Sequence, residues 1–391
     1  MAAPSRRRFS GTASDESRKR RLQEFRDFTL AHPQLVEAKE KLMSAIQDSA
    51  SNSLVMVFGP TGVGKTTLLA KIEKLLTQSL LSSLQTDRAR IPIVSVEAVA
   101  PESGNFSWRD QFKRTLLRME EPLVDCKLPQ PVPESRGNDL NARLTAKTSG
   151  AEYRYAVEQA LRYRRPLAVL IDEAQHLVKL TSGRKLLDQL DVVKSIANLT
   201  GTVHVLFGTY DLLAFRNLNG QLSRRSAEVH FRRYRADQEN DRRSFVNTVH
   251  SFAQPLPFPD PPDLAVDWEY LYERSVGCVG ILKDWLVRAL AQALSRGTKT
   301  LTRPDLESCA PSVSQCERML SEAIEGELRL RESADERRRL RTRLGLTDCT
   351  PDQQGFPGDA GLKPPRRVRP GQRRPVRDEI GRSSLYDGKH A

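Results

Sequence analysis

The chain has 391 residues and a formal net charge of +13, enough length for a large core divided between two packed units. No stretch approaches the roughly 18 consecutive apolar residues of a membrane span, and the amino terminus lacks the apolar segment of a signal peptide. The five cysteines are odd in number and contain no C-x-x-C pair, which argues against a disulfide framework or a zinc site. We expect a cytoplasmic or nucleoid protein.

The positive charge is concentrated at the two ends of the chain. Residues 1–21 hold seven basic side chains against two acidic ones, and residues 361–380 again hold seven against two. The body between them is nearly neutral, so any contact that it makes with a nucleic acid must come from a local stripe of arginines and lysines. Each tail is either a solvated disordered arm or a binding arm, and the sequence leaves both open.

In chain order, residues 1–21 form a predicted disordered basic tail, followed by a helical lead-in from Phe25 to Ile46 that is broken at His32–Pro33. Leu54 to Phe58 is a bare apolar run suited to a central parallel strand. The segment from Thr67 to Leu76 repeats apolar residues at helical spacing. This part of the sequence therefore predicts a strand, a glycine-rich loop and a helix.

The loop between that strand and helix has the spacing G-x-x-x-x-G-K-[ST]. In such a loop the backbone N–H groups wrap nucleotide phosphates, Lys65 reaches the β and γ phosphates, and Thr66 places its hydroxyl on Mg²⁺. A chance match would lack the flanking strand and helix. We expect ATP to be bound by Gly59, Pro60, Thr61, Gly62, Val63, Gly64, Lys65, Thr66 and Thr67.

Apolar strands then alternate with helical patterns. Strands are predicted at 91–99, 166–174 and 202–209, helices at about 108–119, 151–162 and 185–199, and a polar loop at 127–148. Such alternation implies a parallel sheet in an α/β layer. After Tyr234 the strands stop, and helices are predicted at 241–252, from 268, at 280–294 and within 305–344. We divide the chain into a core (22–235), a helical domain (236–345) and a Pro/Gly/Arg-rich tail (346–391) for partner docking.

The strand at 166–174 leads directly into Asp172 and Glu173. Ligands of α/β sheets bind at the carboxyl ends of the strands. Asp172 is suited to the Mg²⁺ shell with Thr66, because Mg²⁺ takes only one or two carboxylates beside phosphate oxygens. Glu173 would orient or deprotonate the attacking water. The alternative is an ordinary acidic helix cap.

Two further elements follow. Thr209 ends the next buried strand and could bond the γ-phosphate or the attacking water, although threonine also fits strand ends and helix caps. Arg224 and Arg225 come next, and a guanidinium supplied to the γ-phosphate of a neighbouring subunit would neutralise charge in the transition state. Either arginine could equally lie on a solvated face.

These four elements in this order, followed by helices, resemble an AAA+ ATPase with a helical lid. The segments LIDEAQHL, FGTYDL, QLSRRS…HFRRY and VGCVGILKDWLVRAL together resemble the TniB/TnsC family of transposition regulators over residues 22–345, and the tail RPGQRRPVRDEIG resembles a signature of some members. The resemblance implies ATP bound between subunits, rings or helical filaments on double-stranded DNA, and hydrolysis stimulated by DNA or a partner. It further implies two kinds of partner, a transposase and a target-selection protein or guide-RNA complex.

By this resemblance Thr209 is sensor 1 and Arg224 or Arg225 the arginine finger. Lys283 follows Gly280 where many AAA+ lids place an arginine facing the phosphates; the alternative is a solvent-facing lysine on an amphipathic helix. By analogy with ATPases that track a duplex backbone, the helix at 108–119 could line a central channel, with contacts to phosphates. The DNA candidates are Arg109, Lys113 and Arg114, with Arg143 and Lys147 in the polar loop, and an ordinary charged surface is the alternative.

Two other functions fit the same core. A replication initiator or helicase loader would add a dedicated DNA-reading module, and no convincing helix-turn-helix follows the lid in the sequence. A nucleotide-gated scaffold would seldom hydrolyse ATP, which the intact Glu173 and the paired arginines disfavour.

Overall fold

The computed structural model describes residues 15–48, 53–100, 106–126, 150–178, 184–216 and 226–346. The chain forms two units, residues 1–332 and residues 333–391. In these described ranges no helix combines the length and the apolar character needed to cross a bilayer.

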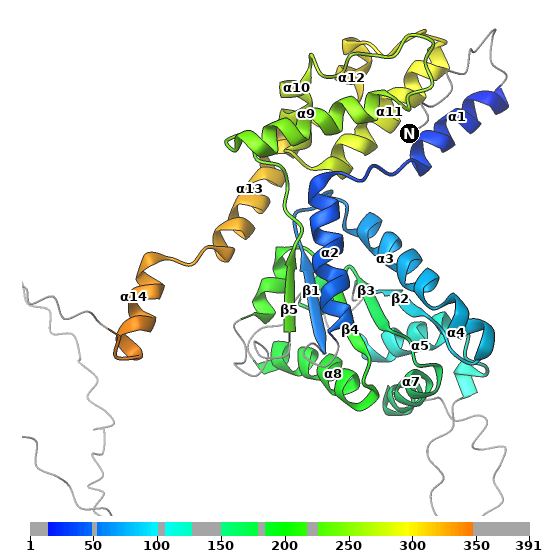
Figure 1. The fold of residues 1–391 in the computed structure, drawn as a ribbon, viewed down its shortest axis with the longest axis vertical. Coiled ribbons are helices and arrows are strands. Elements are labelled where there is room, and N and C mark those ends of the chain that lie inside the picture. The colour runs from blue at the N-terminus through cyan, green and yellow to red at the C-terminus, as the bar shows by residue number, and fades with distance from the viewer. Residues whose placement is uncertain are drawn as a thin grey trace, which may run out of the picture. The chain divides into compact units, whose positions relative to one another are not determined.

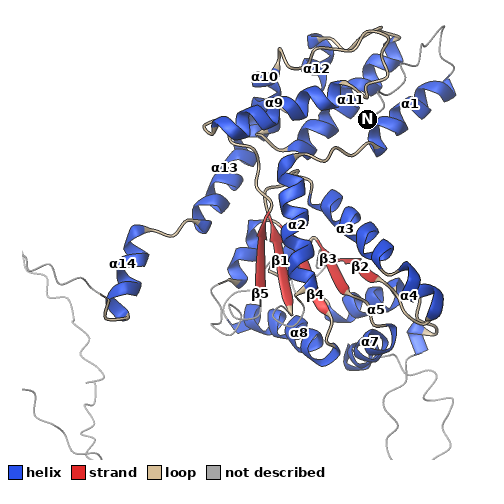
Figure 2. Cartoon of the chain, in the orientation of Figure 1, coloured by secondary structure: helices blue, strands red, loops and turns tan. Residues whose placement is uncertain are grey.

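The first unit contains a sheet of five parallel strands (Figure 2), β1 (Leu54–Phe58), β2 (Ile93–Glu97), β3 (Ala168–Asp172), β4 (Val203–Gly208) and β5 (Ser226–His230), in the order β2-β3-β4-β1-β5. Phe58 pairs with Gly208, and Ile171 pairs with Leu206. The ends of β1, β3 and β4 therefore lie at one edge of the sheet, which brings the glycine-rich loop, Asp172 and Thr209 together. The predicted parallel sheet of an α/β fold is confirmed.

Both faces of the sheet are covered, because successive side chains of a strand point to opposite faces. Val55 and Val57 of β1 pack on the side of α2 (Pro33–Gln47) and α3 (Lys65–Ser79), and Figure 1 shows α2 lying across the sheet. Leu54 and Met56 face the opposite cluster. That cluster includes residues of α5 (Trp108–Arg118), α7 (Gly150–Arg164) and α8 (Arg184–Thr200). Shorter elements are α4 (Leu81–Thr86), η1 (Val124–Cys126), η2 (Ala174–Leu177) and η3 (Tyr210–Phe215).

The helical part of the first unit has its own apolar cluster around the fully buried Trp285. Its helices are α1 (Asp15–Asp27), α9 (Glu239–Ala253), α10 (Trp268–Ser275), α11 (Val279–Arg296) and α12 (Arg303–Cys309). Helix α13 (Val313–Leu330) follows them. In the second unit, α14 (Ala334–Arg343) has a capping box between Ser333 and Glu336 and buries none of its residues. The helical C-terminal region expected from the sequence is thus present.

Helix α1 differs from the expectation at the amino terminus. Residues 15–21, assigned to a disordered tail, are helical, whereas residues 1–14 lie outside the described part of the chain. Phe25, assigned to the α/β core, is buried in the helical cluster and packs edge-on against Phe252 at 6.5 Å. Packing of the carboxyl-terminal half of α1 stabilises a helix that its polar composition alone would not, since most helix stability in proteins comes from tertiary contacts.

Candidate functional site

The predicted phosphate loop connects the end of β1 to the first residue of α3. Gly62 and Gly64 have φ of +74° and +113°, a backbone region that glycine adopts readily and other residues rarely. Gly64 precedes α3 without a side-chain cap, so the first N–H groups of the helix stay available to a ligand. These features fit a phosphate cradle at a helix N-terminus.

Lys65 lies within this loop. Its ammonium donates to the carbonyl oxygens of Gly59 at 3.0 Å and Pro60 at 2.9 Å. Burial lowers the pKa of Lys65 below the usual lysine value, although the nearby carboxylates of Glu173 and Asp172 act in the opposite direction. Phosphate oxygens would add a direct attraction between opposite charges, which the neutral loop carbonyls do not provide to this cation.

Thr66 and Asp172 meet although they are far apart in the sequence. The Thr66 hydroxyl donates to Oδ2 of Asp172 at 3.0 Å, and Oδ1 of Asp172 accepts from the backbone N–H of Glu173 at 2.9 Å. One hydroxyl and one carboxylate at a phosphate loop form the protein part of a typical Mg²⁺ shell. The donor set present here therefore fits Mg²⁺ bound together with a nucleotide.

Glu173 has a left-handed backbone, with φ 53° and ψ 30°. A non-glycine residue pays about 1 kcal/mol or more for this conformation, and such strain is concentrated at functional sites. The turn directs the chain from β3 into η2, immediately after the Mg²⁺-type carboxylate. The strained backbone is thus an additional feature of the candidate base that the sequence did not reveal.

Gln175 is a residue of the candidate site that the sequence did not indicate. Its side chain is buried, donates through Nε2 to Oε2 of Glu173, and accepts through Oε1 from the backbone N–H of Thr209 at 3.2 Å. Gln175 thereby joins the candidate base on one strand end to the predicted sensor on the next. Its position two residues after Glu173 was visible in the sequence, but its bond to Thr209 needed the sheet order.

Thr209 directly follows β4 and precedes η3. Its hydroxyl donates to Oδ2 of Asp211 at 3.1 Å, and the same hydroxyl accepts from the backbone N–H of Asp211. The structure therefore shows the capping role that the sequence left open as an alternative. The side chain also lines a cavity together with Pro60 and Thr61 of the loop, so it faces the phosphate region as well.

The lid contacts the phosphate loop directly through the first turn of α11. The backbone N–H of Ile281 donates to the carbonyl of Gly62 at 3.1 Å. A methyl group on Gly280 would overlap this same carbonyl, so only glycine permits the close approach. The sequence reasoning mentioned Gly280 only as a neighbour of Lys283 and missed this contact.

Lys283 was expected either to face the phosphates or to face solvent, and the structure gives it other partners. Its ammonium donates to the carbonyl oxygens of Arg26 and Phe28, each at 2.6 Å, at the end of α1. Burial lowers the pKa of Lys283, and the carboxylates of Asp284 and Asp27 oppose this effect. A cation at the carboxyl end of a helix satisfies carbonyl groups that have no partner within the helix. In the structure Lys283 thus joins α11 to the end of α1, and these two bonds direct its ammonium to α1 rather than to the phosphate loop.

The arginine finger candidates Arg224 and Arg225 lie outside the described residues, as do the DNA candidates Arg143 and Lys147. The other DNA candidates lie on α5 and are engaged within the chain. Lys113 pairs with Asp125 at 2.5 Å, Arg114 pairs with Asp110 at 2.6 Å, and the Arg109 guanidinium lies 5.8 Å from the centre of the Tyr153 ring.

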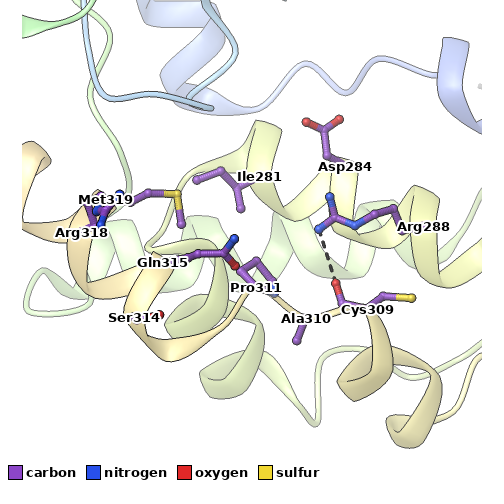
Figure 3. A pocket seen from close by; sticks show the side chains of 10 residues that line it. All are labelled: Ile281, Asp284, Arg288, Cys309, Ala310, Pro311, Ser314, Gln315, Arg318 and Met319. Atoms are coloured by element: carbon purple, nitrogen blue, oxygen red, sulfur yellow. Dashed lines mark hydrogen bonds between the residues drawn. The ribbon is translucent and has the colours of Figure 1, made fainter.

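Two cavities flank this site. One of about 270 Å³ is lined by the phosphate loop, the segment from Thr209 to Asp211, and α13. The other, of about 600 Å³, lies between α11 and α13 (Figure 3), where the side chains of Asp284 and Arg288 come from α11 and those of Gln315 and Arg318 come from α13. Met319 lines both cavities, so α13 forms a wall of each.

The loop on a parallel sheet, the carboxylate pair and the helical lid form a P-loop fold of the AAA+ type. Residues 47–215 match the family described as the AAA domain. A comparison with curated protein sequences gives no significant match.

Three of the solved structures that match this chain are of archaeal proteins. A Walker-type ATPase of Pyrococcus abyssi is 18% identical, with 78% of this chain and 76% of that chain covered and a TM-score of 0.44. The Aeropyrum pernix ORC2 protein is 15% identical, with 75% and 71% covered and a TM-score of 0.48. The Aeropyrum pernix ORC1 protein in complex with DNA is 17% identical, with 74% and 68% covered and a TM-score of 0.46.

Proposed function

We propose that this protein is an ATPase that regulates DNA transposition by assembling as a homo-oligomer on double-stranded DNA. The observation that carries the ATPase part is the Thr66–Asp172 hydrogen bond beside Glu173, at the end of a phosphate loop. The transposition part is supported by the motif resemblance to the TniB/TnsC regulators. The resemblance suggests that the oligomer links a target-selection protein or guide-RNA complex to a transposase.

The chain's own residues divide the ATPase chemistry among themselves. Gly59 to Thr67 would hold the phosphates through backbone N–H groups, with Lys65 on the β and γ phosphates. Thr66 and Asp172 would hold Mg²⁺, which when bound offsets the negative charge that develops on the transferred phosphoryl group. Glu173, held by Gln175, would orient or deprotonate the attacking water.

Thr209 would bond the γ-phosphate or the attacking water, and an arginine from a neighbouring subunit, Arg224 or Arg225, would stabilise the transition state. The active site is therefore complete only between two copies of the chain. In this scheme the chain assembles when it holds ATP and comes apart after it has hydrolysed it. The assembly is a ring or a helical filament.

For DNA we propose the exposed face of α5, with Arg109, Lys113 and Arg114. Ion pairs between exposed side chains are worth about 0–1 kcal/mol, so the pairs of Lys113 and Arg114 can exchange carboxylates for phosphates at little cost. Phosphate contacts would give salt-sensitive binding with little sequence preference. Because the body of each chain is nearly neutral, a single chain would bind DNA weakly. Many subunits in register would raise the overall affinity.

The second candidate function is an AAA+ replication initiator or helicase loader. It is favoured by the same core and lid, and it requires a module that reads DNA sequence. Beyond α12, the described part of the chain contains α13 and α14, and α14 is a single arginine-rich helix. Binding to one defined sequence at least about a hundredfold more tightly than to random duplex would favour this alternative, since specific binding exceeds non-specific binding by such factors or more.

Replacing Glu173 by glutamine tests the proposed cycle. Loss of a general base typically lowers turnover by about 10² to 10⁴, so Glu173→Gln should bind ATP but retain it. We expect its complexes with duplex DNA in ATP to dissociate at least about tenfold more slowly than those of the parent protein, as measured by single-molecule lifetimes. Glu40→Gln, on the exposed side of α2, is the matched control.

The proposed cycle is wrong if Glu173→Gln binds DNA no more stably than the parent protein in ATP. A phosphate-release assay with and without DNA separates the third possibility, a scaffold that seldom hydrolyses ATP. Stimulation by DNA supports the regulator, and a parent protein that releases no phosphate in either condition supports the scaffold.

A further inference from the structure

Helix α13 runs away from the lid (Figure 1), and it contacts both α10 of the lid and η3 of the α/β core. Near its start, the Cys316 thiol donates to the carbonyl of Arg274 in α10 at 3.4 Å, and the Arg274 guanidinium donates to the carbonyl of Pro311 at 3.2 Å. Near its end, Leu330 packs against the core cluster of the sheet. One helix thus contacts both the lid and the core.

A buried ion pair holds α13 at the core. The guanidinium of Arg233, which follows β5, donates through Nε and Nη2 to the two carboxylate oxygens of Glu327 at 2.8 and 3.3 Å. Arg233 is 8% exposed. A two-pronged pair of this kind fixes orientation as well as position, because the planar guanidinium matches the planar carboxylate.

A glycine brings α13 against the residue that follows the predicted sensor. Gly326 lies on the ring of Tyr210, and a methyl group at Gly326 would overlap that ring. The Tyr210 ring cannot move away freely, because it is buried and its hydroxyl bonds to the imidazole of His230 at 2.9 Å. The close approach of α13 to Tyr210 therefore requires a residue without a side chain at position 326.

The docked helix closes one side of the triphosphate region. The cavity of about 270 Å³ has Pro60, Thr61 and Thr209 on one wall and α13 on the other. Its charged residues are Asp211, Glu322, Glu325 and Arg329, three carboxylates against one guanidinium, and Glu325 pairs with Arg329. Carboxylates in this place repel a γ-phosphate, so the docked helix opposes occupation of this side of the site.

We propose that α13 is an intramolecular cover on the γ-phosphate side of the nucleotide site, which opposes self-assembly until it is displaced. The inference rests on the proposed ATP-dependent oligomer and adds its regulation. A second copy must insert its arginine where α13 now lies, so docking of α13 and docking of a second copy compete. Loosening α13 shifts the competition toward assembly.

The sharpest test is Gly326→Ala in the full-length chain. Alanine favours an isolated helix, so the substitution leaves α13 helical while the added methyl group displaces it from Tyr210. Ser321→Ala, on the exposed face of the same helix, also raises helix propensity and creates no overlap, which makes it the control. Glu327→Gln is a second undocking variant that keeps side-chain size and removes the charge paired with Arg233. Thermal unfolding verifies that each variant is folded.

The measurement is self-assembly with a non-hydrolysable ATP analogue, followed by mass photometry over a series of protein concentrations without DNA. We expect both undocking variants to assemble at about tenfold lower protein concentration than the parent protein and Ser321→Ala, a shift equivalent to about 1.4 kcal/mol. Hydrogen exchange should show faster exchange in α13 of the same variants.

The proposal is overturned if both undocking variants assemble only at the same or higher concentrations than the parent protein. The absence of assembly in all four proteins also overturns it, because uncovered chains should then have associated. DNA is left out of the assay, so failure of DNA binding, which would refute the proposed function, does not affect this result.

Discussion

The two walls of the nucleotide site have different origins. One wall consists of the phosphate loop and the ends of β3 and β4, and each of its motifs is a short continuous segment of sequence. The other wall consists of the first turn of α11 and the face of α13, which reach the loop from the distant helical part of the chain. The first wall is assembled by strand order, and the second by close packing of helices against it.

The residues proposed for ATP hydrolysis lie in the first wall, and the contacts proposed for its regulation lie in the second. The first wall holds the groups that we propose to bind phosphate and activate water, and its geometry follows from the order of the strands in the sheet. The second wall approaches the site through two glycines, Gly280 and Gly326, where a single methyl group would prevent contact. Close-packed interfaces of this kind are either docked or apart, because they do not deform continuously. Such a two-state contact can therefore regulate the site that it covers.

The largest effect should follow from damage to the first wall. Lys65→Ala removes the cation that bonds to the loop carbonyls and, in our account, to the β and γ phosphates. We expect a loss of about 3 kcal/mol in ATP binding, roughly a hundredfold, because hydrogen bonds to charged groups contribute up to this amount. Calorimetric titration measures it, and Lys74→Ala on the exposed side of α3 is the control. Equal affinity in both variants would remove the phosphate-loop assignment.

A smaller effect should follow from damage to the second wall alone. Gly280→Ala places a methyl group against the carbonyl of Gly62 and separates α11 from the loop. Overpacking of this kind costs about 1–3 kcal/mol, so nucleotide affinity should fall by roughly tenfold while the core remains folded. Gly150→Ala, where the added methyl group would meet only an ordinary contact, is the control. Unchanged affinity in Gly280→Ala would show that the lid takes no part in binding.

The last prediction concerns folding stability rather than ligand binding, and it lies outside both walls, at His32 before the start of α2. His32 is buried, stacks on Phe231 at 6.2 Å and bonds through Nδ1 to the Tyr234 hydroxyl at 3.1 Å. Burial, with a smaller effect of Lys71, lowers the pKa of His32 to about 4. Between pH 6.5 and 4 the unfolded chain binds a proton that the folded chain does not, so the free energy of unfolding should fall as the pH falls through this range.

For His32 alone this loss should reach about 3 kcal/mol near pH 4, at about 1.4 kcal/mol per unit of pKa. Urea unfolding at a series of pH values measures it. His32→Gln should show a shallower pH dependence than the parent protein, and His250→Gln, an exposed histidine of α9, should show the parent slope. A parental slope in His32→Gln would contradict the buried neutral histidine.

The sequence predicted the first wall well and the second poorly, for physical reasons. Apolar runs and the G-x-x-x-x-G-K-[ST] spacing are local, and the strands at 54–58 and 168–172 fall within the predicted segments. Gln175 was missed because its partner Thr209 is brought near only by strand pairing. The bonds of Lys283 to α1, and the contacts of Gly280 and Gly326, depend on distant helices that helical periodicity does not specify. Residues 15–21 were assigned to a disordered tail for the same reason.

The most direct test of the central claim, an ATP-dependent assembly on DNA, is electron microscopy of the full-length protein with plain duplex DNA and a non-hydrolysable ATP analogue. Our account predicts rings or filaments of many subunits around the duplex, present with the analogue and absent with ADP or with Lys65→Ala. Isolated single chains in every condition, or DNA coated equally with and without nucleotide, would contradict it.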